Sequence, residues 1–259
     1  MNGTTPNFGR RLSGMAGAAM LVLAVAGPAT AMENVHASPS CNLYAGEQVV
    51  DSLQQREGDL KNELLGSASP AIGDHCEIAN IHYQLARMLP DRQAQYLKSC
   101  IDHSQRAILR DSQAGVAYFF KGLCIGRLGE MRGMWGSLQI IEPFRKNMEV
   151  AAQINPALDR GGPHRALGRY YFKLPWILGG DIHKSIDHLL QAVSHGPAYW
   201  ENHFFLAESY FKNNQYLKAR SELQQAMDRA SLLNDDDPDS QTRTVEFQGL
   251  MQAIERNIH

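Results

Sequence analysis

The sequence lacks the motifs of the common catalytic and metal-binding classes. It has no Gly-x-Ser-x-Gly motif, and its cysteines match neither a zinc-site nor a haem-attachment spacing. Residues 180–185 look superficially like a phosphate-binding loop, but the first glycine and the glycine before Lys184 that this motif requires are missing. The closely spaced histidines, such as His183 and His188, do not have the four-residue spacing that brings two side chains together on a helix. We therefore expect no enzyme, no metal site and no cofactor.

The chain also has too little glycine and proline, 22 and 11 among 259 residues, for a disordered or collagen-like protein. It has no large excess of charge. Residues 1–31 carry two arginines and no acid, so the rest holds 23 basic and 27 acidic residues, a net charge of −4. This balance argues against nucleic acid, or an anionic membrane surface, as the main partner.

Residues 1–31 are typical of a secretory signal peptide. Arg10 and Arg11 precede an apolar run over 16–27, and small residues lead to a cleavage site after Ala31. Twelve apolar residues extend about 18 Å as a helix, which is too short for a hydrocarbon core of about 30 Å. No later stretch is apolar enough to span a membrane, so we expect no span in the mature chain. The sequence predicts export, to the periplasm or outside the cell, and no cysteine follows the site for lipid attachment.

Four cysteines, Cys41, Cys76, Cys100 and Cys124, lie in the first half of the chain after the predicted cleavage site. In an exported protein this even number allows two disulfides, with three possible connectivities. Cys100 and Cys124 fall on helices that we expect to be neighbours. Cys41 can tie the N-terminal segment to the helix that begins near Cys76. Four small buried thiols are an equally compatible arrangement.

The strongest positive signal is internal repetition. Residues 200–229 contain a Leu-small-x-x-Tyr helix, a turn at Asn213–Asn214 and a second helix with alanines at the crossing points, which resembles a tetratricopeptide repeat. Ala226 of this repeat has equivalents earlier in the chain at Ala107, Ala151 and Ala192, and of the three spacings, 44, 41 and 34 residues, only the last has the standard length. The pattern predicts an all-α, tetratricopeptide-like right-handed superhelix of about four irregular helical hairpins, at 76–111, 113–156, 163–197 and 199–231. In the second of these, we place the second helix from Phe144 to Pro156.

The segments outside the repeats are predicted to protect the ends of the array. Residues 32–75 form an N-terminal segment with a helix over about 44–65, which Gly58 interrupts. An acidic linker over 232–240 leads to a capping helix over 241–259, because a repeat array needs a polar cover for its last apolar face.

The middle of the chain resembles a more specific family, the periplasmic tetratricopeptide-like component associated with TRAP transporters, or T-component. The resemblance covers roughly residues 110–230. Its motifs here are Asn155-Pro156, Gly161-Gly162-Pro163, Leu167-Gly168-x-x-Tyr171, Leu174-Pro175-Trp176, and Gly179-Gly180-Asp181 with Lys184. The resemblance implies a solute-binding protein as partner, which delivers carboxylates or hydrophobic ligands. It also implies possible self-association as a homo-oligomer, with a channel or pocket that is lined by apolar side chains.

Several residues of these motifs have structural roles. Gly161 and Gly162 allow a sharp reversal, after which Pro163 suits the first position of a helix. Gly168 permits close contact between two helices. Gly179, Gly180 and Asp181 form a turn and a helix start, where an acid is favoured.

The candidate binding residues surround an insertion at 172–179, which is longer than a repeat turn requires and cannot be helical at Pro175. Its apolar side chains either fold over the array as core or line a ligand site. Arg165 and Arg169 either bind an anionic group or are simply solvated. The remaining candidates are aromatic or apolar: Trp135, Tyr170, Tyr171, Leu174, Trp176 and Leu178.

These observations predict an exported tetratricopeptide-like binding protein, associated with a TRAP-type uptake system through its solute-binding protein or an apolar ligand. A general envelope scaffold for assembly of a surface structure, and a carrier of a small hydrophobic molecule, are the alternatives.

Overall fold

The computed structural model describes residues 41, 49–67, 71–131, 133–232 and 240–258. The signal peptide predicted at 1–31 lies outside these ranges, as does nearly all of the predicted acidic linker. Throughout the described ranges the regular elements are helical, which confirms the all-α prediction. None of these helices combines the length and the apolar character needed to cross a membrane.

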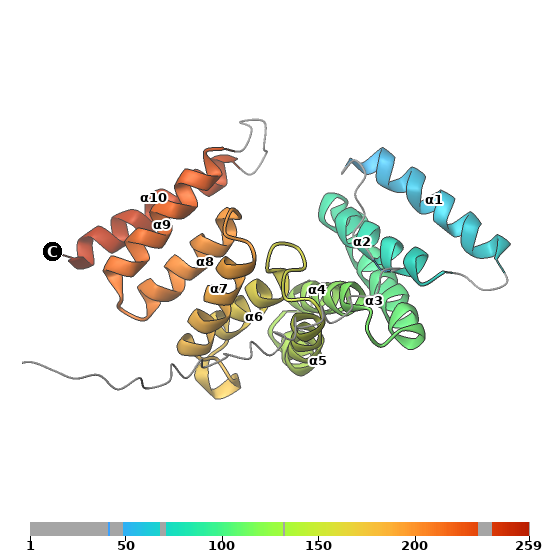
Figure 1. Cartoon of the computed structure of the whole chain (residues 1–259), viewed down its shortest axis with the longest axis horizontal. Coiled ribbons are helices and arrows are strands. Elements are labelled where there is room, and N and C mark those ends of the chain that lie inside the picture. Colours follow the sequence, from blue (N-terminus) through green and yellow to red (C-terminus); the bar gives the residue numbers. More distant parts are fainter. Residues whose placement is uncertain (1–40, 42–48, 68–70, 132, 233–239, 259) are drawn as a thin grey trace, which may run out of the picture. The chain divides into compact units, whose positions relative to one another are not determined.

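Figure 1 shows how the helices follow one another along the chain. Their bounds are α1 Val50–Gly66, α2 Ile72–Met88, the 3₁₀ turn η1 Pro90–Arg92, α3 Gln93–Arg110, α4 Gly115–Met131, α5 Gly133–Ile154, α6 Gly162–Lys173, the 3₁₀ turn η2 Trp176–Leu178, α7 Ile182–His195, α8 Trp200–Lys212, α9 Tyr216–Ala230 and α10 Ser240–Ile258.

The helices pair as successive hairpins, α2 with α3, α4 with α5, α6 with α7 and α8 with α9. Each hairpin also packs on the next, and α10 packs on α9. The alanines that carry the repeat signal, Ala107, Ala151, Ala192 and Ala226, are all completely buried. Small side chains at these points let the helices approach closely, and this is why the repeat pattern is visible in the sequence.

Two helices differ from their predicted extents. α1 continues through Gly58 without a break, because one glycine costs a helix only about 1 kcal/mol and Leu53 and Leu60 on either side of it are completely buried. α5 begins at Gly133 instead of Phe144 and contains Pro143 within it. The long α5 is accommodated by glycines on α4, since a β-carbon on Gly126 would lie only 3.0 Å from the ring of Phe144.

The two glycine-rich turns lie before and after α6, the first helix of the third hairpin. Gly161 adopts a φ of +83° just before α6, and a β-carbon there would lie 2.6 Å from the carbonyl oxygen of Ala192. A β-carbon on Gly180 would overlap the carbonyl oxygen of Leu174. Asp181 is the N-cap of α7, where its carboxylate accepts hydrogen bonds from the backbone N–H groups of His183 and Lys184.

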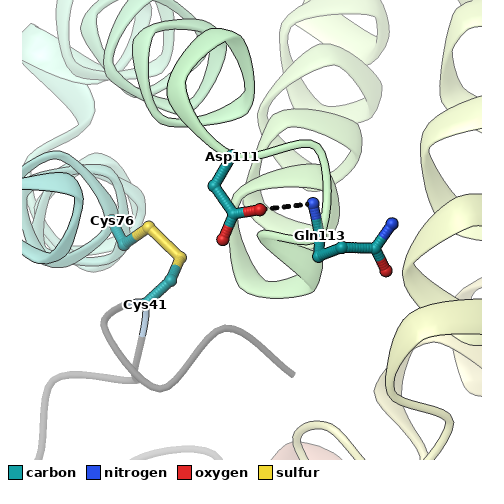
Figure 2. Close-up of a disulfide and its surroundings, with 4 residues drawn as sticks. All are labelled: Cys41, Cys76, Asp111 and Gln113. Atoms are coloured by element: carbon teal, nitrogen blue, oxygen red, sulfur yellow. Dashed lines mark hydrogen bonds between the residues drawn. A yellow bond between two sulfur atoms is a disulfide. The ribbon is translucent and has the colours of Figure 1, made fainter. Parts of the chain in front are cut away.

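All four cysteines are buried and paired in disulfides. Cys41 is bonded to Cys76 on α2 (Figure 2), and Cys100 on α3 is bonded to Cys124 on α4. Figure 2 also shows the turn after α3, where the Gln113 N–H donates to the Asp111 carboxylate at 2.8 Å. The first bond anchors the chain ahead of α1, and the second joins two successive hairpins.

Candidate functional site

A groove of about 460 Å³ lies between α6, α8 and α10, which are the first helices of the last two hairpins and the terminal helix. We call it the terminal groove. It is lined by Arg169, Trp200, Glu201, Phe204, Phe205, Glu208, Thr242, Arg243, Glu246 and Leu250. Its walls therefore combine large aromatic side chains with charges of both signs.

The aromatic side chains of the terminal groove belong to one connected cluster. Trp200 and Phe204 lie one helical turn apart on α8, with ring centroids 6.2 Å apart. Both contact Phe247 on α10, at 5.6 Å and 5.2 Å respectively, and Phe204 also contacts Phe205 at 5.8 Å. These contacts attach α10 to α8 and hold the apolar surface of the groove in a fixed position.

One wall of the groove is an ion pair between Arg169 on α6 and Glu208 on α8. The Arg169 guanidinium also lies over the rings of Phe205, at 4.1 Å, and Phe172, at 4.9 Å. Burial raises the pKa of Glu208, and the nearby carboxylate of Glu246 raises it further, against the opposing effect of Arg169. Among the charged groups of the groove, the carboxylates of Glu208 and Glu246 thus repel each other, and the Arg169 guanidinium is shared with aromatic rings.

The opposite wall is formed by α10. Arg243 lies with its guanidinium 5.2 Å from the centre of the Trp200 ring, while Thr242 and Glu246 are exposed. An extended or helical segment that presents apolar side chains beside charged ones matches such a surface.

Arg165, predicted to bind an anion or to be solvated, is mostly buried and faces carboxylates of this chain. Its side chain is 11% exposed and is paired with Asp159 at 2.6 Å. It also donates to the side-chain oxygen of Asn202 at 3.2 Å and lies over the ring of Tyr199 at 4.6 Å. Arg165 therefore joins the third hairpin to the fourth.

The two predicted tyrosines pack between helices. The ring of Tyr170 is stacked on Phe144 of α5, with centroids 5.7 Å apart. Tyr171 is buried, and its ring is stacked on His188 of α7 at 5.5 Å. Of the predicted binding residues, only Arg169 lines the terminal groove. The side chain of Trp135 lies outside the described part of the chain.

The side chains of Trp176, Ile177 and Leu178 in the insertion do not pack into the core, so the interpretation of these three as core is wrong. Phe172 and Lys173 complete α6, and the turn η2 then exposes Trp176 by 84% and Ile177 by 68%. Leu178 is 37% exposed, and Leu174 is half-buried. These side chains do not line the terminal groove either.

The sequence prediction missed most residues of the groove. One signal was present, because Trp200, Phe204, Phe205 and Glu208 recur at the three-to-four spacing of one helix face. That spacing does not show whether the side chains on this face of the helix pack into the core or line a groove. The contribution of α10 depends on a contact between distant parts of the chain.

Two histidine pairs join helices within hairpins. The Nδ1 atoms of His75 on α2 and His103 on α3 are 3.0 Å apart, and those of His164 on α6 and His188 on α7 are 3.1 Å apart. Among the described residues no three His, Cys, Asp or Glu side chains are grouped so as to hold a metal ion. Burial, together with neighbouring histidines, lowers the pKa of both His103 and His164 to about 4.

These pKa values predict acid sensitivity in a defined range. In the unfolded chain both histidines take up protons near pH 6.5, whereas in the fold they remain neutral to about pH 4. The unfolded state then binds more protons between these values, so the free energy of unfolding is maximal above pH 6.5 and falls as the pH decreases toward 4. We expect a loss on the order of 3 kcal/mol between pH 7 and pH 4.5, allowing for partial exposure of the rings. Urea unfolding at a series of pH values measures it.

The double variant His103→Gln/His164→Gln should flatten this profile above pH 4.5. His183→Gln, at an exposed position on α7, is the matched control and should leave the profile unchanged. Glu57, whose pKa is lowered to about 2 by its hydrogen bonds to His82 and Lys61, adds acid sensitivity only below about pH 4.5. Equal slopes for the wild type and the double variant would show that these histidines are not responsible.

Among solved structures, the chain is similar to a thermophilic tetratricopeptide-repeat protein of Thermus thermophilus, with a TM-score of 0.54. The sequences are 17% identical, and the match covers 78% of this chain and 89% of that one. At this identity the similarity concerns the fold, and it confirms the tetratricopeptide-like architecture. No protein-family model matches the chain, and no curated protein matches it.

Proposed function

We propose that this chain is an exported, tetratricopeptide-like adaptor that binds a segment of another protein in its terminal groove. The observation that carries the proposal is the arrangement of Trp200, Phe204 and Phe205 beside Arg169 and the carboxylates of α8 and α10. A fixed aromatic surface supplies affinity, and charges at its edges determine which partner fits.

The composition of the groove favours a protein segment over a small apolar molecule. A purely apolar ligand would remove water from the Arg169–Glu208 ion pair and from Glu246 without replacing the lost hydrogen bonds, at a cost in free energy. A peptide supplies both apolar contact and compensating hydrogen bonds. No catalytic step is part of the proposal.

For the finer assignment we propose the periplasm as the location and a TRAP-type solute-binding protein as the partner. The leader at 1–31 and the two disulfides support an oxidising compartment outside the cytoplasm. The resemblance to the T-component family, over residues 110–230, supports the partner, and this region includes α6 and α8 of the groove.

The proposal is tested by charge reversal on the exposed edge of the groove. Glu246→Arg should weaken retention of the partner at least about tenfold, because it removes a carboxylate and adds a cation beside Arg243. Tagged wild-type and variant proteins are purified from the native host, and the retained proteins are quantified by mass spectrometry. Asp91→Arg, the same change at an exposed position in η1, is the matched control.

The identity of the retained molecule separates the finer hypotheses. A solute-binding protein that is lost only with Glu246→Arg supports the TRAP assignment, and a secretion or pilus component supports an envelope scaffold instead. A lipid-like mass retained without protein supports a carrier. A partner retained equally by the wild type and by Glu246→Arg would contradict binding in the terminal groove.

A further inference from the structure

The apolar side chains of η2 belong neither to the buried core nor to the lining of the terminal groove. We call Trp176, Ile177 and Leu178 the apolar tip. Two of its side chains are more than two-thirds exposed, and they follow one another directly in sequence. Water contact with a tryptophan and a neighbouring isoleucine is unfavourable, so an exposed apolar group of this kind indicates an interaction site.

The backbone of the turn is rigid and internally hydrogen-bonded. The N–H groups of Leu178 and Gly180 both donate to the carbonyl oxygen of Pro175, at 2.9 Å and 3.0 Å, and Gly179 donates to Trp176 at 3.0 Å. The next N–H, of Asp181, donates back to Tyr171 at 3.1 Å. The tip is therefore held outward by a fixed turn, and these backbone donors do not need water.

Lysines lie at the base of the apolar tip. Lys212 donates to the carbonyl oxygen of Phe172 at 2.6 Å, and its ammonium lies 4.5 Å from the centre of the Phe172 ring. Lys184 at the start of α7 and Lys173 at the end of α6 are both exposed. Two acids lie in the same region, since Glu130 is 3.8 Å from Lys173 and Asp181 caps α7, so Lys184 and Lys212 are the lysines here without a carboxylate partner among the ion pairs of the described residues.

We propose that the apolar tip inserts into the interfacial layer of a lipid bilayer, with the surrounding lysines at the level of the phosphates. Consecutive side chains on a 3₁₀ turn point about 120° apart, so one pocket on a partner protein does not enclose all three, whereas a fluid lipid interface surrounds them. Tryptophan favours this interface, and lysines extend toward the headgroups. The N–H groups of Leu178, Gly179 and Gly180 are satisfied within the turn, which lowers the cost of moving this part of the backbone into the interface.

The proposed contact is shallow and reversible, because a three-residue tip and a few lysines supply limited affinity. It is compatible with the net charge of −4, since the charge near the tip and not the total determines the local attraction. The inference does not depend on the terminal groove.

Vesicle binding tests the proposal. The chain starting at Met32 contains every described helix and both disulfides, and it avoids the apolar leader. It is mixed with vesicles of roughly three parts phosphatidylcholine to one part phosphatidylglycerol, and bound protein is measured by flotation. Trp176→Ser/Ile177→Ser should reduce the bound fraction about tenfold or more. Leu217→Ser, which changes another exposed apolar residue on α9, should leave it unchanged.

A second measurement distinguishes insertion from adsorption. Lipids brominated near the headgroup end of their acyl chains should quench tryptophan emission in the wild type and much less in Trp176→Phe, which still binds. Thermal unfolding confirms that each variant is folded. Absence of vesicle binding by the wild type, or equal binding and quenching with all variants, overturns the proposal. The proposal is also overturned if the tip variant binds vesicles like the wild type but no longer retains the protein partner of the terminal groove.

Discussion

Replacing Asn202 with alanine is expected to lower the free energy of unfolding by about 4 kcal/mol. Asn202 is completely buried, and its side-chain nitrogen lies 2.9 Å from the carbonyl oxygens of Arg160, Ala192 and Gly196. Its side-chain oxygen accepts a hydrogen bond from Arg165. Alanine removes a hydrogen-bond donor from each of these carbonyl groups, of which Ala192 and Gly196 keep a backbone N–H donor, and it removes the polar link between the third and fourth hairpins. Urea unfolding at pH 7 measures the loss.

Asn213→Ala, in the turn at the other end of α8, is the matched control. It should change the free energy of unfolding by less than about 1 kcal/mol. Asn202→Asp is a stricter variant, because it keeps the size of the side chain while it replaces the donor with a second acceptor opposite the three carbonyl groups. A change of less than about 1 kcal/mol in Asn202→Ala would contradict the proposed role of this amide.

Loss of the Cys100–Cys124 disulfide is expected to destabilise the chain by about 3 kcal/mol. The bond joins α3 to α4 across a sequence separation of 24 residues, so it restricts the unfolded chain. Both cysteines are completely buried, and the double variant Cys100→Ala/Cys124→Ala keeps small apolar side chains at these positions. Urea unfolding without reductant compares the variant with the wild type.

Reductant provides the control for this variant. It should shift the wild type toward the double variant, and any response that remains in the double variant reports the Cys41–Cys76 bond. Identical urea midpoints for the wild type with and without reductant would show that neither bond stabilises the fold.

The hairpins could be predicted from the sequence because helix crossings impose a local requirement. Close approach needs small side chains at regular spacing, and the buried Ala107, Ala151, Ala192 and Ala226 meet it. The start of α5 was not predictable in this way. Pro143 suggests a break, and only the contact of α4 glycines with α5 shows how a continuous helix fits.

The candidate site was predicted much less well, for a physical reason. The terminal groove is formed by contacts between α6, α8 and α10. Contacts between such distant helices produce no regular residue spacing that could be recognised in the sequence. The apolar character of a residue also does not predict whether its side chain is exposed or packed against another helix. Trp176 and Phe204 are both large aromatic residues. The hydrogen-bonded turn at η2 exposes Trp176, whereas Phe204 on α8 packs against Phe247.

The central claim is that the terminal groove holds a segment of a partner protein. A photoreactive benzoylphenylalanine at Thr242, an exposed groove position on α10, tests it in the native host. The same residue at Asp91 in η1 is the control. We expect irradiation to produce one discrete protein adduct from position 242 and none from position 91. Adducts from position 91 alone, or equal adducts from both positions, would contradict binding in the groove.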